Sequence, residues 1–382
     1  MFEFKVLLSD LIKAFKLGKS SLGSKTSEAI LQKASLIADK DSGFLTIRMS
    51  NEFSMTEIII KAEIEKSGSL CIDAFMFQVL STYANKKLEM LTFKQKCNDN
   101  GEPLPMFSVK GESNETKDFS FTSNGDYPDT IELEGYKLVN LKCFIDALML
   151  CKSGVSTDNK SKELRCYQID TEGKQIITGN GVQFTQINNL ELGGVATLIE
   201  EKVITSHISI LKELSTYSDT ELVFGKISGF RSKKAGIALT IMGFNGNELK
   251  DIVNLFETTN ILKPICILEL DTKEFNKALE IAKIYEKKAI ENFAASYTSV
   301  QVTEEDISFS LDIPGVASNK KELPITKFSG KIPKIFKFKV SKLLDFTSKI
   351  KSGFITLKLY EDRKPLVVKV DEYPNFTYIQ AL

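Results

Sequence analysis

Three short motifs in this 382-residue chain have residues that could bind phosphate, a dinucleotide or a metal ion. Gly18-Lys19-Ser20 matches the end of a phosphate-binding loop, but that loop needs a glycine five residues earlier, where the chain has Lys13. Gly179 and Gly181 lack the third glycine of a dinucleotide fingerprint, so we expect a turn there. Glu304-Glu305-Asp306 lies between two strand-like runs, which favours a charged hairpin turn over a metal site. We therefore predict no cofactor and no bound metal.

Side chains for proton transfer and thiol chemistry are also scarce. The only histidine, His207, follows Ser206, and we expect it on the surface at the start of a helix. A single histidine disfavours enzymes that transfer protons through imidazole. The cysteines form no C-x-x-C pair, which argues against a disulfide framework and a zinc site; they are Cys71, Cys97, Cys143, Cys151, Cys166 and Cys266. The sequence predicts a protein that is not an enzyme, with no catalytic residues.

Composition and hydropathy indicate a packed, water-soluble chain. Apolar residues make up 42% of it, so the chain can bury a sizeable core, and its length of 382 residues suggests two or three domains. There is no apolar run of the 18 or more residues that cross a bilayer. The first residues, MFEFKVLLSD, lack the features of a signal peptide. We expect a cytoplasmic protein with no membrane partner.

A recurring unit is the strongest pattern in the sequence. Each copy has a short apolar alternation, then Ser, Asp or Asn as a helix N-cap, then apolar residues at helical spacing, then further alternating runs. In the first copy, Phe2, Phe4 and Val6 share one strand face ahead of the helix. Successive caps are 64 to 70 residues apart, at Ser9, Asp73, Asn140, Ser206, Asp271 and Ser341. This regularity predicts six similar units, each a sheet carrying one helix.

Pairs of units are expected to form domains. One helix on one sheet makes a thin core, whereas two units can pack both helices together over a shared sheet. The sequence therefore predicts an α+β fold with three similar domains. Polar stretches around Ser123–Pro128 and at Glu257–Asn260 mark the boundaries, so the predicted domains cover residues 1–129, 130–258 and 259–382.

Several motifs occur in the order found in a known family. Ser21-Leu22-Gly23-Ser24-Lys25 forms the first loop, Phe119-Ser120-Phe121 and then Asp126-Tyr127-Pro128 end the first domain, and GFITLKLYEDRKPLVVKVDEYPNFTYIQAL closes the chain. In spacing and order they resemble the bacterial DNA sliding clamp, the beta subunit of DNA polymerase III, over the full length. The resemblance implies three domains in a DNA clamp fold, with helices lining a central hole and sheets outside.

The resemblance also shows where this chain departs from the family. Where the family has T-D-G-H-R-L in its partner-binding pocket, this chain has Gly179 to Phe184 without the His-Arg pair. The family ends in M-P-M-R-L, whereas this chain ends in Tyr378-Ile379-Gln380-Ala381-Leu382. The chain therefore resembles a diverged clamp, of cellular or viral origin.

The resemblance implies two kinds of protein contact. A peptide pocket for the polymerase maps to Leu164, Gly181, Val182, Gln183, Phe184, Leu255 and the C-terminal residues. A head-to-tail homodimer interface maps to Phe119 and Phe121 at one end and to Ile281 and Ile284 at the other. Joining the two ends would remove the unpaired sheet edges of an open arc.

Charge is distributed unevenly, although Lys plus Arg and Asp plus Glu are equal at 50 each. In the six predicted helical windows, lysines exceed acidic residues by seven. Lysines facing DNA would contact phosphates without reading sequence; the candidates are Lys13, Lys25, Lys142, Lys160, Lys277 and Lys342. The alternative is that lysine is simply a favourable residue on solvated helices.

The predicted function is that of a processivity factor in DNA replication. The ring would encircle double-stranded DNA, tether DNA polymerase and be loaded by a clamp loader ATPase. The alternative is a repeat scaffold that uses the same architecture without binding DNA.

Overall fold

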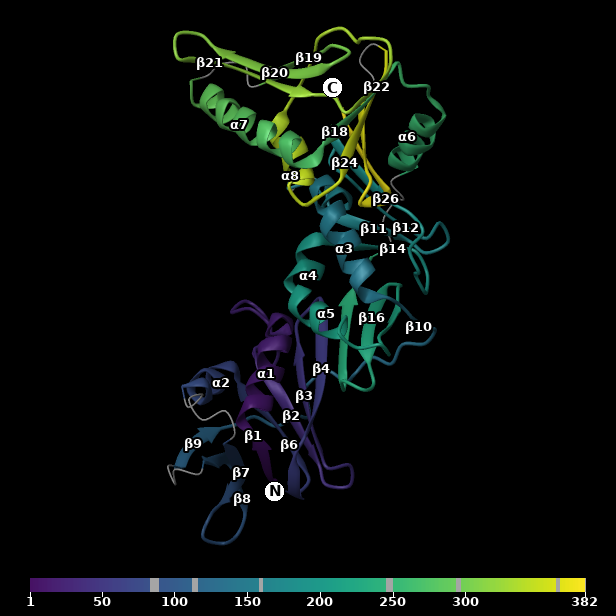
Figure 1. Ribbon diagram of the computed structural model, residues 1–382. Coiled ribbons are helices and arrows are strands. Elements are labelled where there is room, and N and C mark those ends of the chain that lie inside the picture. The colour runs from purple at the N-terminus through teal and green to yellow at the C-terminus, as the bar shows by residue number, and fades with distance from the viewer. Residues whose placement is uncertain are drawn as a thin grey trace. The chain divides into compact units, whose positions relative to one another are not determined.

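The computed structural model describes residues 1–82, 89–111, 116–157, 161–244, 250–292, 297–361 and 365–381. The chain divides into two compact units (Figure 1). Unit 1 comprises Met1–Ile145, Glu191–Val195 and Lys202–Phe244. Unit 2 comprises Asp146–Leu190, Ala196–Glu201 and Asn245–Leu382.

Unit 1 contains two antiparallel sheets. The five-stranded sheet has the order β5 (Glu63–Lys66), β1 (Glu3–Leu7), β7 (Met90–Cys97), β8 (Pro103–Lys110) and β9 (Thr116–Ser120). The eight-stranded sheet has the order β10 (Lys137–Leu138), β15 (Glu221–Val223), β16 (Ile227–Ser232), β17 (Ile237–Met242), β4 (Ser54–Lys61), β3 (Phe44–Ser50), β2 (Lys33–Asp39) and β6 (Gly68–Asp73).

Unit 2 also contains two antiparallel sheets. The nine-stranded sheet has the order β14 (Thr197–Glu200), β11 (Cys166–Asp170), β12 (Gln175–Gly179), β13 (Gln183–Ile187), β26 (Tyr373–Gln380), β25 (Leu366–Val370), β24 (Phe354–Leu359), β18 (Cys266–Asp271) and β22 (Lys327–Gly330). The four-stranded sheet has the order β21 (Ala317–Pro324), β20 (Asp306–Ile313), β19 (Thr298–Val302) and β23 (Phe336–Phe338).

Helices follow the predicted repeat. The six predicted helices start within two residues of their expected positions; they are α1 (Leu8–Gly18), α2 (Ala74–Ser81), α3 (Leu141–Cys151), α5 (Ile208–Leu214), α7 (Thr272–Glu291) and α8 (Val340–Thr347). Short 3-10 turns are η1 (Lys19–Ser21), η2 (Lys152–Gly154) and η3 (Glu163–Arg165). Two further helices are α4 (Glu201–Ser206) and α6 (Lys250–Ile261). The prediction of an α+β fold built from repeated sheet-plus-helix units is confirmed.

Helices pair over the sheets as the repeat predicted. Phe15 of α1 stacks on Phe77 of α2 with 4.1 Å between ring centroids. In unit 2, α7 packs along α8 and against β20. Alternation in the strands gives the core, because Phe2, Phe4 and Val6 are buried on one face.

Strand pairing continues across the predicted domain boundaries. β17 pairs with β4, with Ile237 opposite Ile58, so the eight-stranded sheet joins residues of the first two predicted domains. β13 pairs with β26, with Phe184 opposite Ile379, and this joins the second to the third. Contacts therefore group the chain into two units, and the division into three domains stays a prediction.

The predicted N-caps are only partly correct. Asp73 accepts a hydrogen bond from the Phe75 amide, and Asp271 accepts from the amides of Lys273 and Glu274. Asn140 accepts from the amide of Cys143 at 3.3 Å. These three residues cap their helices as predicted.

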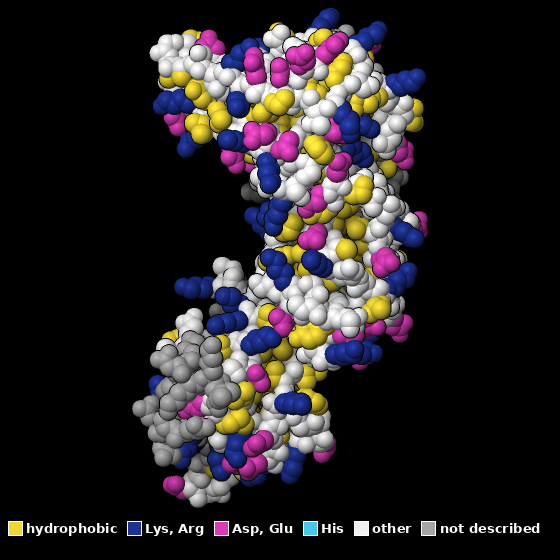
Figure 2. Space-filling view, viewed as in Figure 1, with side chains coloured by type: hydrophobic (Ala, Val, Ile, Leu, Met, Phe, Trp, Pro, Cys, Tyr) yellow, Lys and Arg dark blue, Asp and Glu magenta, His cyan; other side chains and the backbone are white. Residues whose placement is uncertain are grey.

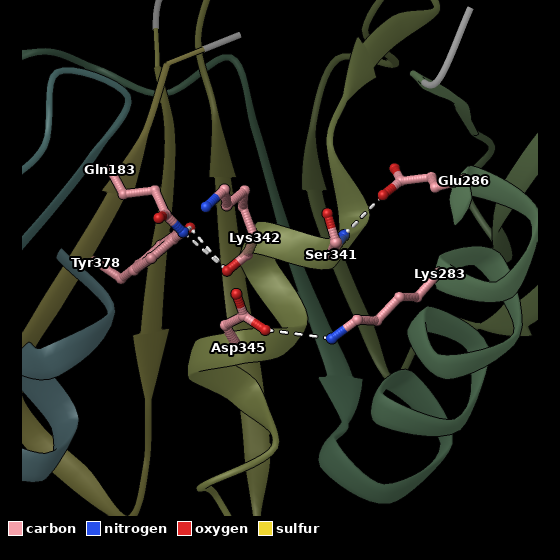
Figure 3. A network of polar contacts seen from close by, with 7 residues as sticks. All are labelled: Gln183, Lys283, Glu286, Ser341, Lys342, Asp345 and Tyr378. Atoms are coloured by element: carbon pink, nitrogen blue, oxygen red, sulfur yellow. Dashed lines mark hydrogen bonds and ion pairs between the residues drawn. The ribbon is translucent and has the colours of Figure 1, made fainter. Parts of the chain in front are cut away.

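The three serines do not cap their helices. Ser9 is the second residue of α1, and Ser206 ends α4, where its hydroxyl donates to the Val203 carbonyl. Ser341 lies inside α8. The start of α8 is held by Glu286 of α7, which is buried and accepts from the amides of Val340 at 2.6 Å and Ser341 at 2.9 Å (Figure 3).

Residues 257–260, the polar segment at the second predicted domain boundary, are helical in α6. One expectation about a polar residue is wrong. His207 is buried rather than exposed. Its Nδ1 is 2.7 Å from the Val203 carbonyl oxygen and its Nε2 is 2.9 Å from the Ser21 hydroxyl, so both ring nitrogens have partners that replace water.

Candidate partner groove, lysine surfaces and sheet edges

The proposed partner pocket is centred on an apolar cluster in unit 2. Helix α6 packs on β12, and the aliphatic side chains between them exclude water. The buried members are Ile177, Ile252, Phe256, Tyr360, Val367 and Ile379, and the half-buried members are Leu164, Phe184, Val253, Leu255 and Leu262. We call this set the apolar cluster. It brings together three residues predicted from sequence: Leu164, Phe184 and Leu255.

The sequence missed the rest of this cluster for a physical reason. Ile252, Leu255, Phe256 and Thr259 recur at helical spacing in α6, which is a readable signal for an amphipathic helix. The exposed side of α6 is polar, and this was interpreted as a boundary. Ile379 lies among the C-terminal residues that the resemblance assigns to the pocket, and on β26 it shares a strand face with buried Thr377.

The other predicted pocket residues lie at the turn between β12 and β13. Gly181 has a φ of 86°, which glycine adopts without strain, so the predicted turn is confirmed. The Asn180 side chain accepts from the amides of Val182 at 3.1 Å and Gln183 at 2.8 Å. Val182 is exposed beside this turn. It is not a member of the apolar cluster.

Gln183 has a structural role on the opposite strand face. Its Nε2 donates to the Lys342 carbonyl at 2.8 Å and to the Tyr378 hydroxyl at 2.7 Å (Figure 3). Tyr378 in turn donates to Gln380 at 3.0 Å. Burial raises the pKa of Tyr378 well above its usual value, so this hydroxyl stays protonated as a donor. The network fixes the first turn of α8 to the ends of β13 and β26.

A cleft of about 690 Å³ opens beside this network. It is lined by η2 and the loop after it, the β12–β13 turn, Tyr297, β23, α8 and the end of β26. Its charged lining residues are mostly lysines: Lys152, Lys337, Lys339, Lys342 and Lys349, with Asp345. We call it the lysine cleft. Lys342, predicted from sequence to contact DNA, therefore lies in one cleft with Val182 and Gln183, which were predicted to contact a partner.

Most of the lysines predicted to contact DNA are available at the surface. They project from a loop or a helix and are free to contact phosphate; the exposed ones are Lys25, Lys142, Lys277 and Lys342. Lys160 lies outside the described residues.

Lys13 is already engaged within unit 1. Its ammonium lies 2.7 Å from the Glu213 carboxylate, which links α1 to α5. The hydrogen bond to Glu213 raises the pKa of Lys13, so the lysine stays charged. A phosphate at Lys13 would have to compete with this carboxylate.

The residues predicted for a dimer interface lie at the edge strand β9 of unit 1 and on helix α7 of unit 2. In unit 1, Phe119 on the edge strand β9 stacks on Phe107 with 5.6 Å between centroids, and Phe121 lies 5.6 Å from Phe2. In unit 2, Ile284 on α7 is 68% exposed, while Ile281 is half-buried. Both ends are partly apolar, as an interface requires.

A shallow apolar hollow of about 380 Å³ surrounds Ile284. Tyr285, Val316 and Ala317 line it, with the stems of Lys287 and Lys288. Figure 2 shows hydrophobic side chains on the surface over α7 and the nearby end of β21. The hollow adjoins β21, the edge strand of the four-stranded sheet.

Other site chemistry is limited in the described part of the chain. Residues 303–305 form the turn between β19 and β20, which confirms the predicted charged hairpin. Among the described residues, no group of His, Cys, Asp and Glu is arranged to hold a metal ion. No helix in these ranges is long and apolar enough to cross a membrane.

Comparison with solved structures identifies the fold. No protein-family model and no curated protein sequence matches the chain. The DNA polymerase III beta chain of Streptococcus pneumoniae aligns with a TM-score of 0.81 and 15% identity, covering 100% of this chain and 99% of that one. The beta subunit of Thermotoga maritima gives 0.80 at 10% identity, with the same coverage.

A third structure, the DNA polymerase sliding clamp of Bacillus subtilis, gives a TM-score of 0.78 at 14% identity and covers 100% of this chain and 98% of that one. The resemblance predicted from the sequence is thus confirmed for the fold. From its first strand to its last, the chain has the fold of the DNA polymerase III beta subunits, the bacterial DNA sliding clamps.

Proposed function

We propose that this protein is a processivity factor, a sliding clamp that encircles duplex DNA and holds a DNA polymerase on it. The observation that carries the proposal is the structural match over the full length of the chain at a TM-score near 0.8. A fold shared over 100% of this chain and 99% of those two chains supports the clamp role more than a repeat scaffold. The role is non-enzymatic and needs no cofactor.

Ring closure would use the two partly apolar ends. The edge strand β9 of one subunit would pair with β21 of the next, so that the unpaired backbone groups of both edges are satisfied. The hollow lined by Ile284 and Tyr285 in one subunit would then be covered by the aromatic side chains of Phe119 and Phe121 from the next subunit. Three predicted domains per chain favour a head-to-tail dimer of six domains, whereas a trimer would make a much wider hole.

DNA contact in this ring would be electrostatic. Lys25, Lys142, Lys277 and Lys342 are exposed point charges without a base-reading motif around them. Such contacts hold duplex DNA without fixing its position, which permits sliding. The lysines assist loading, and retention comes from topology.

The polymerase and the clamp loader ATPase would each bind the apolar cluster through a short peptide segment. Half-buried Leu164 and Phe184 present aliphatic and aromatic surface next to the exposed turn at Val182. A short extended peptide could anchor two or three apolar side chains there. All these partners act in the compartment that holds DNA, which we expect to be the cytoplasm.

Primer extension on a singly primed circular template tests this function. With limiting polymerase from the source of this chain, its clamp loader and ATP, adding the chain should lengthen the products of a single binding event. Phe184→Asp should abolish this effect while leaving the oligomer intact. If adding the wild-type chain does not change the length of the products, the processivity role is contradicted and the repeat scaffold remains as the alternative.

A further inference from the structure

The lysine cleft holds positive charge that nearby carboxylates do not neutralise. Asp345 lines the cleft, but it pairs with Lys283 of α7 at 3.3 Å (Figure 3). Lys152 pairs with Glu201 at 2.6 Å. In the part of the chain that the structure describes, no carboxylate forms an ion pair with the other four cleft lysines, which are Lys337, Lys339, Lys342 and Lys349. Four ammonium groups around one concave space repel one another, so an anionic ligand would be stabilised there.

The backbone that carries these lysines is held in place. The Lys342 carbonyl accepts a hydrogen bond from the Gln183 side chain at 2.8 Å. The Lys339 carbonyl accepts from the Gln380 side chain at 3.2 Å. The ammonium group of Lys349 donates to a backbone carbonyl near the end of α3 at 2.6 Å, and burial holds its pKa below the usual value. An anion beside Lys349 would stabilise its charged form, and a fixed frame loses little entropy when it binds a ligand.

An aromatic ring lies at the same cleft. Tyr297 lines it and is 52% exposed, so much of its surface is open to a ligand. The ammonium group of Lys339 lies 5.5 Å from the centre of this ring. A nucleotide base can stack on such a ring while its phosphates contact the neighbouring lysines. The volume of about 690 Å³ is within the range of small-molecule sites.

We propose that the lysine cleft binds a nucleoside triphosphate, with the phosphate chain among the lysines and the base on Tyr297. A triphosphate concentrates several negative charges on adjacent groups, which suits unpaired ammonium groups that line one space. Duplex DNA is a rigid rod that carries one negative charge per phosphate, so it contacts projecting lysines better than lysines grouped in a recess. The nucleotide is held without reacting. The inference goes beyond the clamp function and does not depend on it.

Fluorescence anisotropy with adenosine triphosphate labelled on the ribose tests the proposal on the whole chain, at low salt and without magnesium. The labelled nucleotide should bind. Unlabelled adenosine triphosphate should compete about tenfold more strongly than adenosine monophosphate, because its additional phosphates add two or three modest ion pairs. The affinity should fall at high salt, since screening weakens these pairs.

Variants then assign the binding to the cleft. Lys337→Ala with Lys339→Ala should weaken binding of the labelled nucleotide about tenfold, because two of the four unpaired charges are lost. The matched pair Lys226→Ala with Lys234→Ala, two exposed lysines of unit 1, should leave the affinity unchanged. Tyr297→Ala should weaken adenosine triphosphate but not inorganic triphosphate. Tyr297→Phe keeps the ring and should retain the affinity of the wild-type chain.

Three results would overturn the inference. Absence of binding at low salt would remove the site. Equal competition by adenosine monophosphate, or by inorganic triphosphate with no effect of Tyr297→Ala, would remove the assignment to a nucleoside triphosphate. Complete displacement by a short duplex, with both ligands weakened equally by the Lys337 and Lys339 substitutions, would make the cleft part of a DNA-binding surface. Primer extension can still be stimulated in each of these cases, so their failure is distinct from failure of the processivity function.

Discussion

The buried carboxylate of Glu286 should be the main support of helix α8. Glu286 is 3% exposed and accepts hydrogen bonds from the amides of Val340 and Ser341 and, at 3.2 Å, from the Thr298 hydroxyl. These amides begin α8 and have no partner inside the helix. A carboxylate at this end also interacts favourably with the helix dipole. One side chain thus joins α7, β19 and α8.

The cost of removing it can be worked out from these bonds. Glu286→Ala would leave two buried amides without a partner, at about 1–3 kcal/mol each, and would lose the dipole interaction of about 1 kcal/mol. We expect unit 2 to be destabilised by about 3–7 kcal/mol. Glu286→Gln keeps one acceptor oxygen, so about half of that loss is expected.

Hydrogen exchange measured by mass spectrometry, together with urea unfolding followed by circular dichroism, checks this. Amides of α8 should exchange about 100-fold faster or more in Glu286→Ala, since 1.4 kcal/mol is about a factor of ten. The control is Glu280→Ala, an exposed glutamate on the same helix, which should stay within about 0.5 kcal/mol. A loss below 1 kcal/mol, or one equal to the control, would refute the capping role.

Further outcomes follow from the same structure. Burial holds the pKa of His207 below its usual 6.5, so the ring is neutral at pH 7. The contribution of His207 to the free energy of unfolding should therefore be complete above pH 6.5. It should decrease as the pH falls from 6.5 toward the lower pKa of His207 in the folded protein. The single histidine should titrate below pH 6.5 by NMR, and a midpoint at or above 6.5 would contradict this burial. Iodoacetamide should label the exposed thiols of Cys97 and Cys143 first. Burial raises the pKa of the other four thiols, which are Cys71, Cys151, Cys166 and Cys266. Fast labelling of any of these four would contradict their packing. Alanine at the four exposed candidate lysines should lower the slope of log K for DNA binding against log salt by at most about 0.9 per lysine; the residues are Lys25, Lys142, Lys277 and Lys342. Alanine at four exposed control lysines should leave the slope unchanged; these are Lys226, Lys234, Lys263 and Lys334. An equal effect of both sets would refute the assignment.

Local patterns in the sequence were sufficient to predict the repeated architecture. Strand alternation such as Phe2, Phe4 and Val6 and helical spacing after Asp73 and Asp271 depend on neighbours within one element, so they can be read directly. The predicted helix N-caps were wrong where a residue distant in the sequence supplies the cap. Ser341 has the right type for a cap, yet Glu286, 55 residues earlier, supplies the acceptor.

The candidate site was only partly predictable for the same reason. Leu164, Phe184 and Leu255 were placed by resemblance, and the structure brings them into one apolar cluster. The lysine cleft could not be read from the sequence, because Gln183 and Lys342 are 159 residues apart and meet only through the pairing of β13 with β26. Clustering of charge from distant segments is a property of the fold.

Retention on circular DNA is the most direct test of the ring. The labelled chain is loaded onto a nicked circular plasmid, freed of unbound protein by gel filtration, and half of the sample is then cut at a single restriction site. A closed ring held by topology should remain on the uncut circles and slide off the cut molecules. Equal loss from both samples, or equal retention on both, would contradict the proposal that this chain encircles DNA.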